Sequence, residues 1–395
     1  MIVVGAGVGG LRTVEQLRTL GFDGTISLVG EEQHAPYDRP PLSKQVLTGE
    51  WEPSRTVLRT RDALDELGVR AHLGVPAVRV RPGEVELSDG RSLRGDAVVA
   101  ATGLAPRALP GQPEPVFRLR TVGDAVALRD TLARIGSLLI IGGGFIGAEV
   151  ASAARRRGIA VTVIEALPVP SARVLGHRLG ALAGRLLTEG GVTLRTGCPI
   201  SGFESAGRDG RVAVRLADGE IVQADAAVVG IGGVPRIEWL DATGVDTTDG
   251  IACGPTGRVH GLAGTWAVGD IAAWDDPEHG GRYRHEHWTS AVDQAAAAAR
   301  DILGLPAADA SVPYFWSDQF GVKIQLVGRP DTADGILPLR GEGLDGGPVR
   351  GTVVGYTAGD RLVAVIGFGA AGAVARYRRL VTDGADSAKA LALSA

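Results

Sequence analysis

The sequence predicts an α/β fold with two Rossmann-like nucleotide-binding domains and a smaller C-terminal α+β domain. A Gly-x-Gly-x-x-Gly turn joins an apolar strand to a helix twice, at residues 5–10 and 142–147. Segments 85–107 and 214–236 repeat each other without gaps. After residue 313 the sequence is rich in residues typical of strands, and no Gly-x-Gly-x-x-Gly turn recurs. A chain of 395 residues is long enough for two or three domains with their own cores.

The first glycine turn follows a short β-branched strand and precedes a helix expected over residues 11–20. Gly5 makes the tight turn, Gly7 lets a pyrophosphate approach the backbone, and Gly10 lets the helix pack on the strand. The unpaired N–H groups at the start of the helix favour phosphate oxygens. This stretch therefore predicts a dinucleotide site that could hold NAD or FAD.

An acidic residue follows the next strand in each copy. The strand expected at 25–29 is followed by Glu31, and the strand at 160–164 is followed by Glu165. Each carboxylate lies about 20 residues after its last glycine, where it can hydrogen-bond the ribose hydroxyls of a bound nucleotide. For Glu31 the alternative is a solvated loop carboxylate.

The segment Tyr37–Lys44 contains two consecutive prolines. We expect a stiff non-helical loop that holds Lys44 in a defined place. From this segment alone, an ordinary surface lysine is the simpler interpretation.

The repeat extends well beyond the glycine turns. Each copy reads Asp-Gly turn, aspartate, apolar strand, glycine turn and Pro-Arg in register. A glycine pattern that arose by chance would not be followed by the same hairpin and closing strand in both places, so two copies of one nucleotide-binding domain are expected. Thr121 and Asp124 form a capping pattern for a helix that runs to about Arg134, before the second copy.

Composition excludes several classes of protein. The net charge of −4 argues against nucleic-acid binding, which usually comes with a basic excess. No run of about 18 apolar residues is present, so no membrane partner is expected. Met1 leads directly into a strand without a targeting peptide, so we expect a cytoplasmic protein. Cys198 and Cys253 form no Cys-x-x-Cys, which excludes a redox disulfide of that kind and predicts two small buried thiols.

Eight motifs follow one another from about residue 2 to about residue 330. They are Val4–Gly10, Arg39–Lys44, Ala101–Gly103, Gly142–Glu149, Gly232–Pro235, Ala267–Asp270, Glu286–Trp288 and Phe315–Asp318. Their sequences and order resemble the flavin-dependent ferredoxin reductases of the putidaredoxin reductase type, within the pyridine nucleotide–disulfide reductase fold. Each motif is modestly specific and the ordered set is very specific.

The resemblance implies that the first glycine turn binds FAD and the second binds NADH. It implies an FAD-binding domain at residues 1–107 and 237–304, interrupted by an NADH-binding domain at 108–236, with a C-terminal α+β domain at 305–395. No resident metal is expected, since His285 and His287 have no further ligand cluster.

The resemblance also assigns roles to single residues. Gly9 and Glu31 contact the adenosine-diphosphate half of FAD, and Asp270 contacts its ribityl chain or phosphates. Trp288 lies against the pyrimidine side of the flavin. Lys44 lies near the isoalloxazine and pairs with Glu149 at the nicotinamide site, and these two are the implied catalytic residues. The implied cofactor-binding residues are Gly5, Gly7, Gly9, Gly10, Glu31, Arg39, Lys44, Ala101, Thr102, Gly103, Arg129, Gly142, Gly144, Ile146, Gly147, Glu165, Gly232, Gly269, Asp270, Glu286, His287 and Trp288.

The implied activity is FAD-dependent NADH:ferredoxin reduction. Hydride passes from NADH to flavin N5, and single electrons then pass to an acidic [2Fe–2S] ferredoxin that serves an oxygenase. A carboxylate at Glu165 favours a 2′-hydroxyl and repels a 2′-phosphate, so NADH is expected rather than NADPH. The protein is expected to be a monomer or weak dimer.

Two alternatives share the nucleotide motifs. The first is an NADH oxidase or quinone reductase. Relatives that reduce oxygen or peroxide usually carry a catalytic cysteine in the region that here reads Leu42-Ser-Lys44, which counts against it. The second is an NADH-responsive flavoprotein similar to apoptosis-inducing factor, which shares the lysine–glutamate pair. Basic clusters at 155–157 and 376–379 could steer an acidic ferredoxin, although solvated helix faces are the simpler interpretation.

Overall fold

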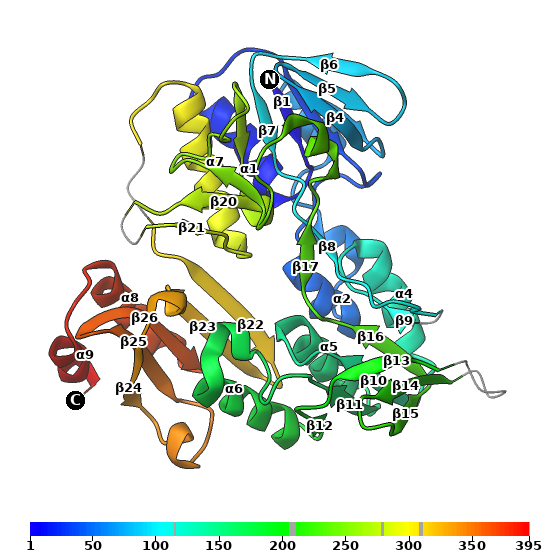
Figure 1. The fold of residues 1–395 in the computed structure, drawn as a ribbon, viewed down its shortest axis with the longest axis vertical. Coiled ribbons are helices and arrows are strands. Elements are labelled where there is room, and N and C mark those ends of the chain that lie inside the picture. Colours follow the sequence, from blue (N-terminus) through cyan, green and yellow to red (C-terminus); the bar gives the residue numbers. More distant parts are fainter. Residues whose placement is uncertain (114–115, 205–210, 278–279, 308–310, 395) are drawn as a thin grey trace. The chain divides into compact units, whose positions relative to one another are not determined.

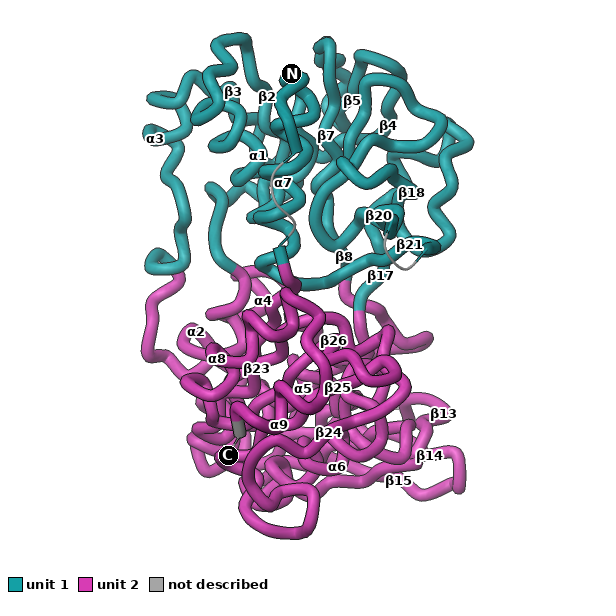
Figure 2. Tube along the Cα trace, turned by 90° about the vertical axis from the view of Figure 1, so that its left-hand side faces the viewer, with its two compact units in different colours: residues 1–38, 54–105, 233–311 teal, residues 39–53, 106–232, 312–395 magenta. Residues whose placement is uncertain are grey.

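The computed structural model describes residues 1–113, 116–204, 211–277, 280–307 and 311–394. The chain divides into two compact units, which Figure 2 shows in teal and magenta. Unit 1 comprises residues 1–38, 54–105 and 233–311, and unit 2 comprises residues 39–53, 106–232 and 312–395. Residues 39–53 therefore belong to unit 2, although they come between two segments of unit 1.

Unit 1 is built on a five-stranded parallel sheet (Figure 1). Its strands pair in the order β19 (Thr265–Ala267), β7 (Val98–Ala100), β1 (Ile2–Val4), β2 (Ile26–Gly30) and β3 (Val69–Leu73). All residues of β1, β2, β7 and β19 are buried, as expected of parallel strands with both faces covered. Three helices accompany the sheet, α1 (Val8–Thr19), α3 (Arg61–Glu66) and α7 (Trp288–Ile302), and α1 packs along α7.

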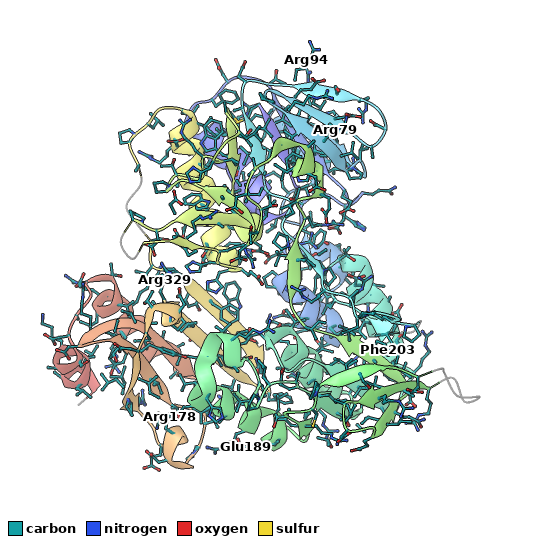
Figure 3. The ribbon with its side chains drawn as sticks, in the orientation of Figure 1. Arg79, Arg94, Arg178, Glu189, Phe203 and Arg329 are labelled. Atoms are coloured by element: carbon teal, nitrogen blue, oxygen red, sulfur yellow. The ribbon has the colours of Figure 1, made fainter. Side chains whose placement is uncertain are left out.

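Two small sheets complete unit 1. The first is antiparallel and contains β4 (Ala77–Arg81), β5 (Glu84–Leu87) and β6 (Ser92–Arg94). Val80 and Val85 are buried in the core, whereas Arg79 and Arg94 are exposed. Figure 3 shows Arg94 extending outward. The second contains β18 (Ile251–Cys253), β20 (Ala272–Asp275) and β21 (Arg282–Tyr283). Short 3-10 turns are η2 (Pro53–Thr56), η3 (Glu238–Thr243) and η4 (Gly269–Ile271).

Unit 2 contains a second parallel sheet with an equivalent strand order. It runs β12 (Thr193–Arg195), β11 (Ala160–Ile164), β10 (Ser137–Ile141), β16 (Ala226–Val229) and β9 (Val116–Phe117). Its helices are α4 (Val122–Leu132), α5 (Phe145–Arg156) and α6 (Ala172–Glu189), and α6 is kinked at Gly176. The antiparallel strands β13 (Ile200–Phe203), β14 (Val212–Leu216) and β15 (Ile221–Ala224) correspond to β4–β6.

The two sheets differ in where their fifth strand comes from. In unit 1 the edge strand β19 follows the rest of the sheet in sequence, whereas in unit 2 the edge strand β9 precedes it. The chain leaves unit 1 through β8 (Leu104–Pro106) and returns through β17 (Gly233–Pro235), and these two strands pair. Residues 106–232 of unit 2 are thus inserted between two segments of unit 1.

The C-terminal part of unit 2 is a five-stranded antiparallel sheet with helices. The order is β22 (Tyr314–Gln319), β23 (Val322–Gly328), β26 (Arg361–Phe368), β25 (Val353–Ala358) and β24 (Gly335–Arg340). One face packs on leucines of α6, and the other packs on α8 (Ala371–Thr382) and α9 (Ser387–Ser394). The turns η5 (Pro330–Thr332) and η6 (Gly343–Asp345) join its strands.

The predicted fold class is confirmed by the sheets and helices described above. The Asp89-Gly90 hairpin, the Thr121 cap and the strand-rich C-terminal domain are all present. The expected non-helical loop at residues 37–44 is wrong, because Pro40–Ser43 forms the 3-10 helix η1 and Gln45–Thr48 forms α2. Proline suits the first turn of a helix, where its missing N–H has no partner to lose. The predicted domain bounds stay a prediction.

The cap of α4 provides a test of local stability. Thr121 accepts a hydrogen bond from the Asp124 N–H at 3.1 Å, and Asp124 accepts one from the Thr121 N–H at 2.7 Å. We expect Thr121→Ala to lower the free energy of unfolding by about 1 kcal/mol. Thr131→Ala removes a half-buried threonine near the end of the same helix, whose hydroxyl donates only to the Ala127 carbonyl one turn earlier; it is the control and should change the free energy of unfolding little. Urea denaturation measures both, and equal losses would contradict the role of the cap.

Candidate active site

The first and third glycines of each turn are required by the protein's own packing. Gly5 has φ +120° and Gly142 has φ +106°, a region that favours glycine. A Cβ at Gly5 would overlap the Ala101 carbonyl, and one at Gly142 would overlap the Gly230 carbonyl. A Cβ at the third glycine of either turn would overlap the carbonyl of the first glycine. These four glycines make the turn and the helix–strand contact possible.

The middle glycine of each turn faces open space instead. No atom of the described residues lies within 4 Å of a Cβ built on Gly7, and at Gly144 the nearest is the Gly230 carbonyl oxygen at 3.9 Å. Gly7 and Gly144 are the N-caps of α1 and α5, and neither helix has a side-chain cap. The N–H groups at both helix starts are therefore arranged for an external anion, and the space beside them suits a pyrophosphate.

The acidic residues after β2 and β11 have different partners. Glu165 accepts from the Gly143 N–H and the Leu167 N–H, both at 2.8 Å, so both of its oxygens are oriented by backbone beside the second turn. Glu31 accepts from Arg236 Nη2 at 2.9 Å. The interpretation of Glu31 as a solvated loop carboxylate therefore overlooked an ion pair. The signal for Arg236 was present in the sequence, because it closes the second copy of the internal repeat.

Lys44 and Glu149 form an ion pair in unit 2. Lys44 Nζ lies 2.8 Å from Glu149 Oε2 and 3.1 Å from the Pro40 carbonyl oxygen. The exposed fractions of the two side chains are 12% and 3%. The interpretation of Lys44 as an ordinary surface lysine is wrong, and η1 holds the lysine against α5.

Two serines that we did not single out complete this cluster. Ser43 donates to Glu149 Oε2, and Ser317 donates to Glu149 Oε1 at 2.6 Å. Both serines lie inside motifs recognised in the sequence, but nothing in those motifs shows that their hydroxyls meet one carboxylate. The cluster joins three segments of unit 2, which are η1 with Lys44, α5 and β22.

Comparisons with known proteins identify the family. Residues 1–295 match the family model described as pyridine nucleotide-disulphide oxidoreductase, and residues 314–394 match the one described as reductase C-terminal. The chain belongs to the pyridine nucleotide-disulphide oxidoreductase family.

Several proteins to which this chain is similar are named as ferredoxin reductases. It is 39% identical over 340 residues to rhodocoxin reductase of Rhodococcus erythropolis, covering 85% of this chain and 79% of that one. It is 39% identical over 333 residues to the ferredoxin–NAD(+) reductase subunit of the benzene 1,2-dioxygenase system of Pseudomonas putida, covering 82% and 80%. The reductase in a covalent putidaredoxin reductase–putidaredoxin complex superposes with a TM-score of 0.91 at 32% identity, covering 97% and 93%. The resemblance seen in the sequence is confirmed.

The remaining predicted cofactor residues of unit 1 gather on its strand ends and on the start of α7. Trp288 Nε1 donates to Asp38 at 2.8 Å, and Thr102 Oγ1 donates to the Arg236 carbonyl at 2.6 Å. The Asp270 carbonyl accepts from Arg284 at 3.0 Å, and so does the Glu286 carboxylate at 2.8 Å. His287 is the N-cap of α7, and Ala101, Gly103 and Gly269 lie at the ends of β7 and β19.

The remaining predicted residues of unit 2 lie along η1, α4 and the second turn. Arg39 donates to the Arg120 carbonyl at 2.6 Å, and Arg129 lies 3.7 Å from Glu52. Ile146 is 45% exposed at the start of α5, an apolar surface beside Gly144 where a nucleotide could pack. The Gly232 carbonyl accepts from the Arg107 N–H at 2.9 Å. The roles of these residues toward a cofactor stay predictions.

The cysteines do not supply the disulfide in the family's name. Both are free thiols. Burial raises the pKa of the Cys253 thiol to about 12, so its reactive thiolate is negligible near neutral pH. Cys198 is half-buried, so the prediction of two buried thiols holds for Cys253 alone.

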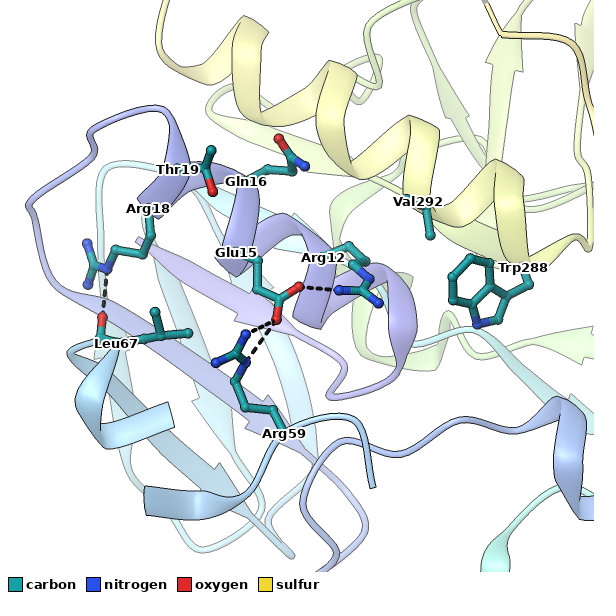
Figure 4. Close-up of a pocket in the computed structure, with 9 residues that line it drawn as sticks. All are labelled: Arg12, Glu15, Gln16, Arg18, Thr19, Arg59, Leu67, Trp288 and Val292. Atoms are coloured by element: carbon teal, nitrogen blue, oxygen red, sulfur yellow. Dashed lines mark hydrogen bonds and ion pairs between the residues drawn. The ribbon is translucent and has the colours of Figure 1, made fainter. Parts of the chain in front are cut away.

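A pocket of about 460 Å³ lies on α1 and α7 of unit 1 (Figure 4). Its charged groups already serve one another or the backbone. Glu15 accepts from Arg12 at 2.5 Å and from Arg59 at 2.9 Å, and Arg18 donates to the Leu67 carbonyl at 2.8 Å. Trp288 forms one wall, and the Arg12 guanidinium lies 5.9 Å from its ring.

The basic cluster at 155–157 is only partly the expected solvated face, whereas the cluster at 376–379 has the exposure expected of one. Arg155 donates to the Ile159 carbonyl and Arg157 to the Leu47 carbonyl, so these two serve packing within unit 2. Arg156 and the arginines of α8, Arg376, Arg378 and Arg379, are exposed.

The glycine geometry predicts that two neighbouring substitutions differ in effect. We expect Gly147→Ala to lower the free energy of unfolding by about 1–3 kcal/mol, because the new methyl overlaps a backbone carbonyl and forces a shift. Gly144→Ala, the matched control, meets open space and costs less than about 1 kcal/mol. Urea unfolding of the two variants measures the difference, and equal stability of the two would contradict this account of the turn.

Proposed function

We propose that this protein is an FAD-dependent NADH:ferredoxin reductase that delivers electrons to an oxygenase system. One observation carries the proposal. Two phosphate-type glycine turns, each with an open middle position, occur in a chain whose two cysteines are unpaired. Two dinucleotides can bind, and the electrons need an acceptor outside the chain. The relatives, which include a ferredoxin–NAD(+) reductase and a putidaredoxin reductase in complex with putidaredoxin, suggest the class of that acceptor.

The turn of unit 1 is the proposed FAD site. The N–H groups at the start of α1 would hold the pyrophosphate, and Glu31 would accept from the adenosine ribose while Arg236 fixes its orientation. Trp288, held by Asp38, would support the flavin. When bound, FAD supplies the chemistry of accepting a hydride and releasing single electrons, which the protein's own side chains cannot supply.

The turn of unit 2 is the proposed NADH site. The start of α5 would bind the pyrophosphate, and Glu165 would accept from the adenosine ribose hydroxyls with the lone pairs that its backbone donors leave free. The same carboxylate repels a 2′-phosphate. Lys44 and Glu149 are the proposed residues of the nicotinamide end of the site. The ammonium group of Lys44 would favour the negative charge that the flavin ring gains on reduction.

The proposal of a ferredoxin as acceptor rests on the relatives and on the absence of a nearby nucleophile. Residues 42–44 read Leu-Ser-Lys, and Ser43 is occupied with Glu149. This segment therefore offers no thiolate to oxygen or peroxide. The quinone reductase and the apoptosis-inducing-factor-like alternatives are outcomes of the test below.

Coenzyme preference tests the role of Glu165. We expect the wild type to prefer NADH, because a carboxylate beside a 2′-phosphate costs several kcal/mol. Glu165→Gln keeps the size of the side chain, removes its charge, and should raise the NADPH-to-NADH ratio of kcat/KM about tenfold or more. Glu189→Gln removes the same charge from an exposed position on α6 and should leave the ratio unchanged. Equal kcat/KM for both coenzymes in the wild type would refute the assignment.

The acceptor is tested directly by anaerobic titration followed by turnover. NADH should bleach the flavin of the holoenzyme, and cytochrome c reduction should then depend on an added [2Fe–2S] ferredoxin. If turnover is unchanged without ferredoxin, or is faster with a quinone, ferredoxin is not the acceptor. Slow bleaching with a long-lived charge-transfer band would instead favour the NADH-responsive flavoprotein.

A further inference from the structure

We propose that Ser43 and Ser317 are positioning residues that hold the Glu149 carboxylate fixed against Lys44, and that Gln319 directs the Ser317 hydroxyl toward that carboxylate. The inference rests on the proposed role of the Lys44–Glu149 pair. It adds to that role the side chains that keep the glutamate in place, which come from segments 43–44 and 317–319.

The bonds to Glu149 are divided between its two oxygens. Oε2 receives Lys44 Nζ and Ser43 Oγ, and Oε1 receives Ser317 Oγ. A carboxylate held at both oxygens cannot rotate without breaking a bond. An ionised carboxylate only accepts hydrogen bonds, and all three contacts supply it with donors.

Gln319 determines which way the Ser317 hydroxyl points. Gln319 Nε2 donates to Ser317 Oγ at 3.0 Å, and both side chains lie on one face of β22 as alternate residues. A hydroxyl has one hydrogen, so a Ser317 oxygen that accepts from Gln319 gives that hydrogen to Glu149. Ser317 is fully buried and Gln319 is 2% exposed, so these bonds form away from bulk water, where they are stronger.

The charged groups around Glu149 are few. Lys44 is the charged side chain that the described structure bonds to it. Asp318 follows Ser317 but points to the opposite face of β22, where it pairs with Lys323 at 3.1 Å. The three neutral side chains therefore complement a single ion pair.

Ser152 provides a matched control on the same helix. It lies three residues after Glu149 on α5, is 9% exposed, and accepts from the Phe320 N–H at 2.9 Å. Ser152→Ala thus removes one buried hydrogen bond between α5 and the C-terminal segment without removing a donor from Glu149. Ser317→Ala removes a bond between the same two segments, but from the carboxylate.

Two readouts on the FAD-loaded enzyme separate positioning from simple packing. The first is urea stability. Each variant removes one hydrogen bond between α5 and the C-terminal segment, so Ser317→Ala and Ser152→Ala should both lower the free energy of unfolding. This readout measures the packing contribution that the two serines share.

The second readout is the rate of flavin reduction by NADH, measured by stopped flow. A hydrogen bond to a charged group changes an equilibrium about tenfold or more, so Ser317→Ala should lower this rate about tenfold. Gln319→Leu keeps the hydroxyl but frees its direction and should lower the rate less, and Ser317→Thr restores a hydroxyl and should recover most of the rate. Ser152→Ala should keep the wild-type rate.

The outcomes decide the inference separately from the proposed function. Ferricyanide accepts electrons without ferredoxin, so a failure with ferredoxin alone refutes the proposed acceptor and leaves the serine readouts intact. If Ser317→Ala loses stability but reduces the flavin as fast as Ser152→Ala, or if Ser317→Thr is as slow as Ser317→Ala, the positioning role is wrong. Should Ser317→Ala not fold, Ser43→Ala carries the same test from the other oxygen.

Discussion

The burial of the Glu149 carboxylate is the constraint on which the candidate active site depends. A charge with 3% exposure is tolerated only when it is paired and hydrogen-bonded, and three segments of unit 2 provide the partners. The N-cap of the same helix is Gly144, which lies about 7.5 Å along the helix before Glu149 at 1.5 Å per residue. One helix therefore presents a start without a side-chain cap and, little more than a turn later, the carboxylate that holds Lys44.

The two copies of the glycine turn, one in each unit, have the same pattern of backbone contacts. In each turn the first and third glycines are dictated by backbone contacts, and the middle glycine is left for something outside the protein. The copies then diverge in their acidic residue, since Glu165 is oriented by backbone N–H groups whereas Glu31 is paired with an arginine. The acidic residues of the two turns are therefore held differently, which is consistent with the two turns binding different dinucleotides.

Much of this could be predicted from the sequence, because glycine turns, hairpins and caps are local signals. The two Rossmann-like domains, the α4 cap and the Lys44–Glu149 pair follow from motifs and the family resemblance, whereas the order of the strands in each sheet was not predicted. The contacts of Ser43 and Ser317 with Glu149 join residues 106 and 168 positions apart, and spacing carries no information on such pairs. Arg236 was recognisable as the end of the second repeat, but its pairing with Glu31, 205 positions away, was not predicted. The 3-10 helix at Pro40–Ser43 was missed because two prolines suit a first helical turn as well as a stiff loop.

The most direct test of this account is to measure FAD and NAD⁺ binding to Gly7→Ala and Gly144→Ala in parallel. Both substitutions place a methyl group where the described protein atoms leave room, so any loss of binding reports on the ligand rather than on folding. The account predicts that Gly7→Ala is purified folded but poor in FAD, whereas Gly144→Ala keeps its FAD and binds NAD⁺ weakly. Loss of FAD from Gly144→Ala with normal FAD content in Gly7→Ala would contradict the assignment of the two turns.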